Sequence, residues 1–214
     1  MQPKAKNNCA ALHAWARSLK RHTFPFDESL LPHDGIYLLF EKGEKSHGNE
    51  RVVRVGTHTG VGQLRSRLRQ HFVVENKDRS IFRKNIGRAL LNKRGDAYAS
   101  VWELDMTPAA ARKLNGHKLN AAKQARVERQ VTAYLQKNFS FAVVEVPSKA
   151  KRLQLESKII STLSHCNECV GSALWLGNHS PKEKIRQSGL WLVNELYKKP
   201  ISAADLVYLQ GLKK

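Results

Sequence analysis

Two short apolar segments joined by a polar turn constrain the fold of this chain more than any other feature. Residues 35–41 and 51–55 are rich in β-branched and aromatic side chains, whereas residues 43–48 are polar and begin and end with glycine. Such segments on either side of a turn predict two antiparallel strands that pair as a hairpin. We therefore expect a β-sheet that begins with this hairpin.

Most of the remaining chain has a helical pattern of apolar residues. The expected helices are residues 10–21, 63–72, 80–92, 107–137 with a break near Gly116, 151–164, 182–197 and a short one from Pro200. Two further segments have a strand pattern, residues 98–104 and 139–146. The sum predicts an α+β protein with a small central antiparallel or mixed β-sheet flanked by helices.

The length of 214 residues suits one domain with added segments. We expect an N-terminal helical extension at residues 1–32 and a main domain at residues 33–180. A strand and helix insertion interrupts that domain at about residues 96–137, and residues 181–214 form C-terminal helices packed on it.

The chain has a large excess of positive charge, with 37 Lys and Arg against 18 Asp and Glu. Because 41% of the residues are hydrophobic, this is a folded protein with a basic surface. Such a surface favours a nucleic-acid partner, since cations release counterions from phosphates; the other interpretations are an anionic membrane or solubility alone. No window approaches the ~20 apolar residues of a membrane span, and the N-terminus lacks the apolar core of a signal peptide. We expect a cytoplasmic protein without a membrane partner.

Three cysteines are an odd number, which fits reduced thiols better than a disulfide framework. His165, Cys166 and Cys169 have metal-like spacing, and His179 follows further on. A zinc site would need a second pair of similar quality, which the sequence lacks. We therefore expect buried free thiols rather than zinc.

The helix expected at residues 63–72 has a basic edge beside its buried stripe, which is formed by Leu64, Leu68 and Phe72. At about 100° per residue, Arg67 and His71 lie together on one flank of this stripe. Two arginines lie on the other flank, Arg65 and Arg69. A flank position borders core and cleft, so this pair is either part of an active site or the edge of a solvated basic face.

The helix expected at residues 151–164 places a carboxylate among apolar residues. Its apolar face is formed by Leu153, Ile159, Ile160 and Leu163. Glu156 projects into the middle of this face, where an unpaired carboxylate costs several kcal/mol or becomes neutral. A divalent metal or a buried arginine would be its partner, and we favour the metal.

Together these motifs resemble the GIY-YIG nuclease superfamily in order, spacing and structural context. The residues that carry the resemblance are Gly35-Ile36-Tyr37, Val55-Gly56, Arg67 with His71, and Glu156. The resemblance covers roughly residues 33–92 and 138–180. Asn178, within Gly177-Asn178-His179, is similar to the asparagine that follows the glutamate helix in the family, with Asn167 and Asn194 as alternatives. Arg54 stands where the second tripeptide of the family has tyrosine.

The resemblance implies an endonuclease that hydrolyses DNA phosphodiesters with a single divalent metal. The implied catalytic residues are Tyr37, Arg54, Arg67, His71, Glu156 and Asn178. Glu156 would hold Mg²⁺ or Mn²⁺, and Arg67 would clamp a phosphate oxygen. Tyr37 would orient or deprotonate the attacking water with help from His71 and nearby cations, and Asn178 would orient groups around the phosphate.

Residues 64–94 contain ten Lys or Arg against two acids. The candidate DNA-binding residues on these helices are Arg65, Arg69, Arg79, Arg83, Lys84 and Arg88, which would hold a duplex backbone without reading its sequence. The bland alternative is a solvated helix surface. The insertion is also basic, and it either enters a groove or packs on the sheet.

Two other function classes remain open. One is a catalytically inactive DNA- or RNA-binding module on the same fold. The other is a structural RNA-binding protein, against which the carboxylate of Glu156 argues, since such proteins need no unpaired carboxylate in a core. A single active site cuts one strand, so double-strand cleavage would require a dimer or two visits.

Overall fold

A computed structural model describes residues 3–212 of the chain, and the side chains of residues 8–212. Residues 1–2 and 213–214, the ends of the two expected terminal extensions, lie outside the described residues. The helices of the described part are α1 Pro3–Arg17, α2 Leu64–Phe72, α3 Ile81–Lys93, α4 Ala99–Trp102, α5 Ala109–Asn115, α6 Ala121–Asn138, α7 Lys149–Ser164, α8 Glu183–Ser188 and α9 Ala203–Gly211. Short 3₁₀ turns lie at Glu28–Leu30, Lys77–Arg79, Gly116–Lys118, Asn167–Cys169 and Leu176–His179.

Four strands form one antiparallel sheet in the order β1-β4-β2-β3. They are β1 His22–Thr23, β2 Gly35–Ser46, β3 Asn49–Gly56 and β4 Phe139–Glu145. The hairpin of β2 and β3 turns through His47 and Gly48, both at positive φ (51° and 70°). Two consecutive positive-φ residues give a turn whose twist matches the strands it joins. The expected hairpin and the strand at residues 139–146 are confirmed.

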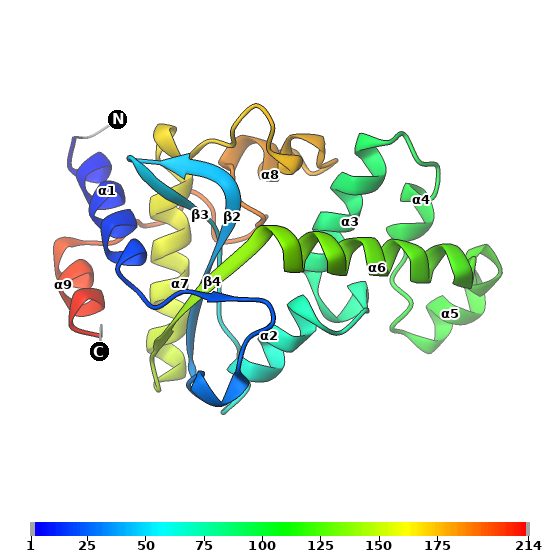
Figure 1. Ribbon diagram of the computed structural model, residues 1–214, viewed down its shortest axis with the longest axis horizontal. Coiled ribbons are helices and arrows are strands. Elements are labelled where there is room, and N and C mark those ends of the chain that lie inside the picture. Colours follow the sequence, from blue (N-terminus) through cyan, green and yellow to red (C-terminus); the bar gives the residue numbers. More distant parts are fainter. Residues whose placement is uncertain (1–2, 213–214) are drawn as a thin grey trace.

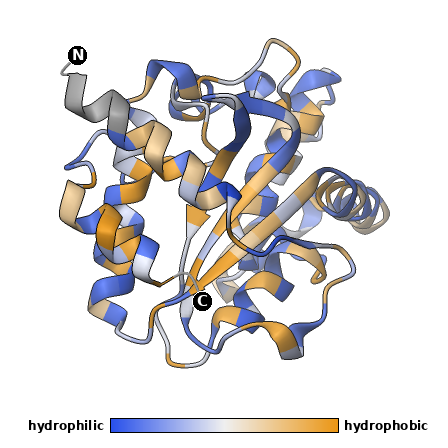
Figure 2. Ribbon diagram, turned by 60° about the vertical axis from the view of Figure 1, so that its left-hand side comes forward, coloured by the Kyte–Doolittle hydropathy of each residue, from blue (hydrophilic) through white to orange (hydrophobic). Residues whose placement is uncertain are grey.

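Both faces of the sheet are covered, because alternate residues of β2 point to opposite sides. Ile36 and Leu38 pack into the core beneath α1, α7 and α9. Tyr37 and Leu39 pack into a second core beneath α2, α3 and α6. Figure 1 shows these helices on the two sides of the sheet, and Figure 2 shows hydrophobic residues along the central part of the strands. The predicted α+β class, a small sheet flanked by helices, is confirmed.

The segment between α3 and β4 contains α4, α5 and α6, and it extends away from the sheet (Figure 1). The expected break near Gly116 is present, as a 3₁₀ turn between α5 and α6. The division into an extension at residues 1–32, a domain at 33–180 with this insertion, and a C-terminal part at 181–214 stays a prediction.

Two predicted elements were wrong. Residues 98–104 contain helix α4 rather than a strand, because Trp102 is buried against α3 and donates its indole N–H to the carbonyl of Lys84 at 3.0 Å. The helix expected at residues 182–197 ends at Ser188, since Gly189 adopts a left-handed φ of 68°. The chain then turns along the sheet, where the backbone N–H of Trp191 donates to the Val53 carbonyl of β3 at 2.8 Å.

None of the helices between residues 3 and 212 is both long and apolar enough to cross a membrane.

Candidate functional site

The centre of the site is Tyr37, which lies opposite Gly56 in the β2–β3 ladder. The tyrosine is fully buried. A Cβ atom on Gly56 would lie 2.1 Å from the Tyr37 hydroxyl oxygen, so only glycine leaves room for the phenol. The two motifs that begin and end the hairpin are therefore one structural unit.

A hydrogen-bonded chain leads from this phenol to α3. The hydroxyl oxygen of Tyr37 is 2.8 Å from His71 Nε2, and His71 Nδ1 is 2.7 Å from Ser80 Oγ. His71 is fully buried with its ring edge-on to Phe82. Burial, and then the charges of Arg54, Arg67 and Arg83, lower the pKa of His71 well below its usual value of 6.5. The imidazole is therefore neutral at neutral pH.

Arg54 lies between the tyrosine and the carboxylate expected to bind metal. Its guanidinium is buried over the ring of Phe82, 5.0 Å from the centroid, and donates to the carbonyl of Trp191. Burial lowers the pKa of Arg54, while Tyr37 and Glu156 favour its charged form. The residue that departs from the family's tyrosine thus places a cation beside the phenol.

Glu156 reaches the same place from α7. Its Oε1 accepts the backbone N–H of Thr57 at 3.1 Å, just after β3. Burial raises its pKa, an effect that Arg54 and the Thr57 N–H oppose. The carboxylate faces a cavity of about 270 Å³ whose polar lining includes Arg54, Asn85, Asn194 and Glu195.

The predicted environment of Glu156 needs correction. The face of α7 that lies in the core includes Leu155, Ile159, Ile160 and Leu163, whereas Leu153 is exposed. Glu156 is only half-buried and has a hydrogen-bond donor. It lies where the core borders a cavity lined by both polar and apolar residues, rather than in the middle of an apolar face. The expected depth of burial was therefore too great.

Arg67 lines a second cavity of about 300 Å³ beside the first. Its guanidinium is half-exposed and donates to Gln70 Oε1 at 3.1 Å and to the Arg79 carbonyl at 3.2 Å. Thr57 joins the two cavities, since it lines this one and donates to Glu156. The described residues that line the second cavity include no carboxylate; they are Thr57, His58, Thr59, Gln63, Ser66, Arg67 and Gln70.

The structure does not bring Asn178 into this cluster. Asn178 is exposed, and its side chain donates to the carbonyls of Ser172 and Ala173, where it stabilises its own loop. Asn194 lines the Glu156 cavity instead. The position of Asn194 after the glutamate helix could be recognised in the sequence. Nothing in the sequence distinguishes Asn85, which lies among the buried residues of α3.

Half of the expected DNA-binding set lies inside the protein, so the basic stripe expected on α3 is not a surface. Arg83 is fully buried and pairs with Glu128 at 2.8 Å. Lys84 donates to the Glu103 carbonyl, and Arg88 forms two hydrogen bonds to the Glu103 carboxylate. The positive charge of α3 suggested a solvent-exposed helix. Instead, Glu128 of α6 and Glu103, which follows α4, accept hydrogen bonds from its cations.

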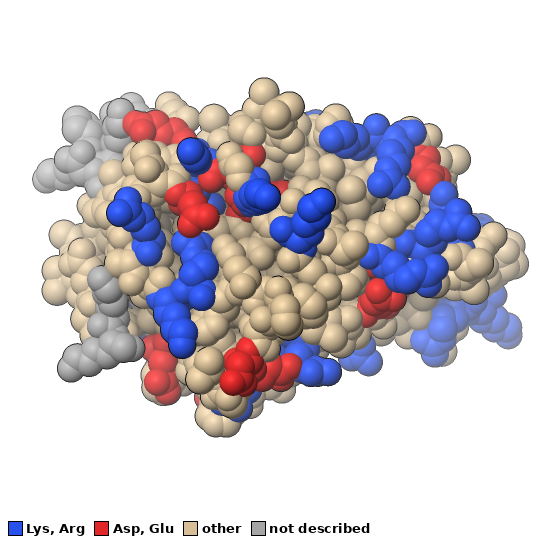
Figure 3. Space-filling view, in the orientation of Figure 1, with Lys and Arg blue, Asp and Glu red and all other residues tan. Residues whose placement is uncertain are grey.

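The other three residues of the expected DNA-binding set are nearer the surface. Arg65 donates to the Leu31 carbonyl, and Arg69 pairs with Glu28 at 2.8 Å. Arg79 is exposed. Further exposed cations lie on the insertion and the end of α3: Lys93, Arg94, Arg112, Lys113, Lys118 and Arg129. Figure 3 shows Lys and Arg gathered over this end of the molecule.

The chain is similar in sequence to a known family over most of its length. The sequence model of a family described as "GIY-YIG domain" matches residues 14–211. Among curated proteins and among solved structures, nothing matches the chain.

Proposed function

The chain belongs to the GIY-YIG domain family, whose members are generally endonucleases, and from this premise we propose that it is a metal-dependent endonuclease that hydrolyses DNA phosphodiester bonds. One observation carries the proposal. The phenol oxygen of Tyr37 lies 2.8 Å from the neutral imidazole of His71. Arg54 is a charged neighbour of both this phenol and the carboxylate of Glu156. A structural core has no need of this combination of titratable groups.

The residues around Glu156 suit a hard divalent cation. One carboxylate oxygen has a backbone donor, and the carboxylate faces a cavity whose polar lining residues include Asn194 and Glu195. Mg²⁺ takes oxygen ligands and keeps several waters, so one or two carboxylates suffice. We propose Glu156 as the ligand of Mg²⁺ or Mn²⁺. When bound, the metal would neutralise charge on the scissile phosphate and its leaving oxygen.

Tyr37 is proposed to position or deprotonate the attacking water. Its hydrogen bond to His71 fixes the direction of the hydroxyl, and the guanidinium of Arg54 lies beside it. His71 acts in its neutral form, because burial opposes a charged imidazole there. Since Tyr37 is fully buried, side chains around it must rearrange before the phenol meets water.

Arg67 is proposed to bind a non-bridging phosphate oxygen. Its guanidinium lies in a polar cavity whose described lining residues include no carboxylate, next to the cavity of Glu156. A permanently charged planar fork suits this task better than an ammonium. Duplex DNA is the proposed substrate, held by the exposed cations of the insertion. Further parts of the proposal are a cytoplasmic location and dimerisation for double-strand cleavage.

Conversion of supercoiled plasmid to nicked or linear DNA in Mg²⁺ or Mn²⁺ tests the function. We expect the wild-type protein to cleave, and Glu156→Gln, Tyr37→Phe and Arg67→Lys each to lose at least ~100-fold in rate, the usual range for general acid–base catalysis and oxyanion contacts. Asn178→Ala is the matched control. It should retain nearly full activity, because the Asn178 side chain bonds only its own loop in the structure.

The alternative, an inactive DNA- or RNA-binding module, gives a different result. Wild-type and Glu156→Gln proteins would then bind nucleic acid equally well while neither converts the plasmid in any divalent metal. Equal cleavage by the two proteins would instead point to a contaminating nuclease and remove the support for Glu156. Competition among duplex DNA, single strands and folded RNA at stated salt separates the substrates.

A further inference from the structure

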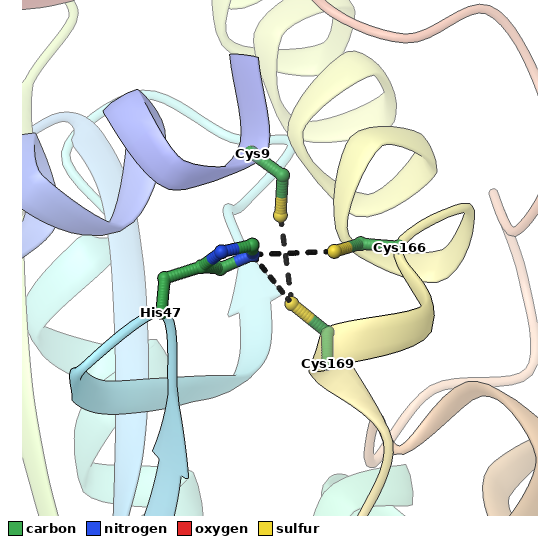
Figure 4. Close-up of side chains that lie close together, drawn as sticks. All are labelled: Cys9, His47, Cys166 and Cys169. Carbon is green, nitrogen blue, oxygen red and sulfur yellow. Dashed lines mark hydrogen bonds between the residues drawn. The ribbon is translucent and has the colours of Figure 1, made fainter. Parts of the chain in front are cut away.

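Three cysteines and a histidine from distant parts of the chain meet on the opposite side of the sheet from Tyr37. Cys9 comes from α1, His47 from the β2–β3 turn, and Cys166 and Cys169 from the segment after α7 (Figure 4). The four candidate ligand atoms all lie within 4.8 Å of one another. The three thiols are buried and form no disulfide.

The distances between these atoms fit tetrahedral coordination. His47 Nε2 lies 3.2 Å from Cys166 Sγ and 4.0 Å from Cys169 Sγ, and the sulfurs of Cys9 and Cys169 are 3.5 Å apart. Zinc bonds of about 2.3 Å to sulfur and 2.0–2.1 Å to nitrogen give tetrahedral edges of about 3.5–3.8 Å. The separations of the four ligand atoms, 4.8 Å at most, are thus close to those that a tetrahedral zinc ion requires.

The histidine is oriented as a metal ligand is. Its Nδ1 lies 3.0 Å from Glu168 Oε2, which leaves Nε2 directed at the sulfurs. A carboxylate on the outer nitrogen fixes the ring and its tautomer in many zinc sites. His47 also occupies a left-handed backbone conformation (φ 51°) in the tight turn, and this brings the ring back over the sheet.

A second histidine beside the cluster has other partners. His13 Nδ1 lies 3.0 Å from the Cys9 carbonyl, and its Nε2 accepts the Val52 N–H at 3.4 Å. The same nitrogens also lie near the cluster, Nδ1 at 3.7 Å from Cys9 Sγ and Nε2 at 3.9 Å from Cys169 Sγ, but each already has a backbone partner. His165 and His179, the candidates from local spacing, lie elsewhere: His165 Nε2 is 3.2 Å from the Lys198 carbonyl, and His179 is exposed.

We propose that Cys9, His47, Cys166 and Cys169 bind one structural Zn²⁺ ion. Thiolate and imidazole ligands select zinc over the hard cations that suit a carboxylate site. The ion would connect α1, the hairpin turn and the end of α7. Because four closed protein ligands leave no position for water or substrate, its role is stability rather than catalysis, so the proposal is independent of the nuclease function.

Metal analysis of the tag-free protein, purified with a reductant and without chelators, tests this site. We expect one equivalent of zinc by mass spectrometry of the metal, and Co²⁺ in its place should give thiolate-to-cobalt charge-transfer absorption. Cys9→Ser and His47→Ala should lose the ion. The matched control is His165→Ala, which removes a histidine next to Cys166 but should keep one equivalent.

A variant of the outer carboxylate covers the case in which ligand variants fail to fold. Glu168 is 43% exposed, so Glu168→Gln should fold and bind zinc about 10- to 100-fold more weakly in competition with a chromophoric chelator. Wild-type protein that holds no zinc and shows no cobalt–thiolate absorption would overturn the proposal. A Cys9–Cys169 disulfide in freshly purified protein, or loss of zinc in His165→Ala but not in His47→Ala, would do the same.

Discussion

Tyr37 packs directly against Gly56, so the two motif residues depend on each other. The tyrosine ring fills the space in which a Cβ of residue 56 would lie. The glycine of the second motif is therefore a steric requirement of the first motif and does not depend on a positive φ. This relation explains why the glycine fits even though Arg54 replaces the expected tyrosine two positions earlier.

We expect Gly56→Ala to displace the phenol and break its hydrogen bond to His71. Overpacking of a buried site costs about 1–3 kcal/mol, and nuclease activity should fall with it. Urea unfolding and plasmid cleavage measure the two effects. Gly116→Ala is the control, because no atom lies within 4 Å of its added Cβ; equal stability of wild type and Gly56→Ala would contradict the steric argument.

His71 should make the protein less stable in acid. Its pKa is about 6.5 when unfolded and well below that when folded, so below pH ~6.5 the unfolded state binds a proton that the folded state does not. Stability that is present above pH 6.5 is therefore lost as the pH falls, by up to about 1.4 kcal/mol per pH unit.

Urea unfolding of wild type and His71→Gln between pH 5 and 8 measures this contribution. The difference in unfolding free energy should be constant above pH 7 and shift against the wild type below it. Burial also lowers the pKa of His13, to about 4, and that of His22 and His58. These groups are common to both proteins and cancel, so parallel curves would show that His71 is not the group responsible.

Among single residues, the sequence predicted those tied to a motif and missed those placed by the tertiary fold. Tyr37, His71 and Glu156 follow from local order and helical periodicity. Asn194 replaces Asn178 in the Glu156 cavity because the helix expected at residues 182–197 stops at Gly189. The left-handed glycine thus accounts for Asn194, whereas Asn178 is held in its own loop by the carbonyls of Ser172 and Ala173.

Helix α3 shows how charge misleads at the scale of an element. Its arginines suggested a surface, but Arg83 lies between α3 and α6 with Glu128 and Thr132 as partners. Glu128 also accepts the backbone N–H of Lys77. Partners that lie 45 and 49 residues away in sequence cannot be found from helical periodicity, which concerns only residues on the same helix.

We expect Glu128→Ala to destabilise the protein by about 3–5 kcal/mol, because it leaves the guanidinium of Arg83 buried and uncompensated. Gln130→Ala, which removes a solvent-exposed hydrogen bond to Arg94, should change stability by less than about 0.5 kcal/mol. Denaturant unfolding compares the two. A destabilisation below about 1 kcal/mol in Glu128→Ala would mean that water reaches Arg83.

At the scale of the whole molecule, a group of exposed positive charges lies on the insertion. Replacement of Arg112, Lys113, Lys118 and Arg129 by Gln should weaken binding to all duplexes. The slope of log K against log salt concentration should also become shallower, by up to about 0.9 for each DNA phosphate that the variant no longer neutralises. Fluorescence anisotropy at several salt concentrations measures this slope.

The matched control removes the same number of exposed charges from the hairpin and the C-terminal segment, at Lys42, Lys45, Lys198 and Lys199. It should leave the slope nearly unchanged. If both sets of substitutions lower affinity equally, net charge rather than the insertion accounts for binding.

The fold class was predictable because the hairpin and the helices have strong local patterns. The Cys/His cluster was not, since its ligands lie as far apart in sequence as Cys9 and Cys169. Only the packing of α1 against the sheet and the turn at His47 brings them together. Local spacing of cysteines and histidines cannot indicate a site whose ligands come from three separate elements.

The segment after Gly189 also affects how copies of this protein can meet. A strand with free N–H and C=O groups at the rim of a sheet is a template for self-association. Here Trp191 bonds the outer rim of β3 at Val53, and the opposite rim is the two-residue strand β1. Each rim of the sheet is thus partly covered, which limits edge-to-edge pairing with a neighbouring chain at Val53 and at Ser140–Phe141. At these positions, two molecules that assemble to cut both strands of a duplex would touch through other parts of the chain.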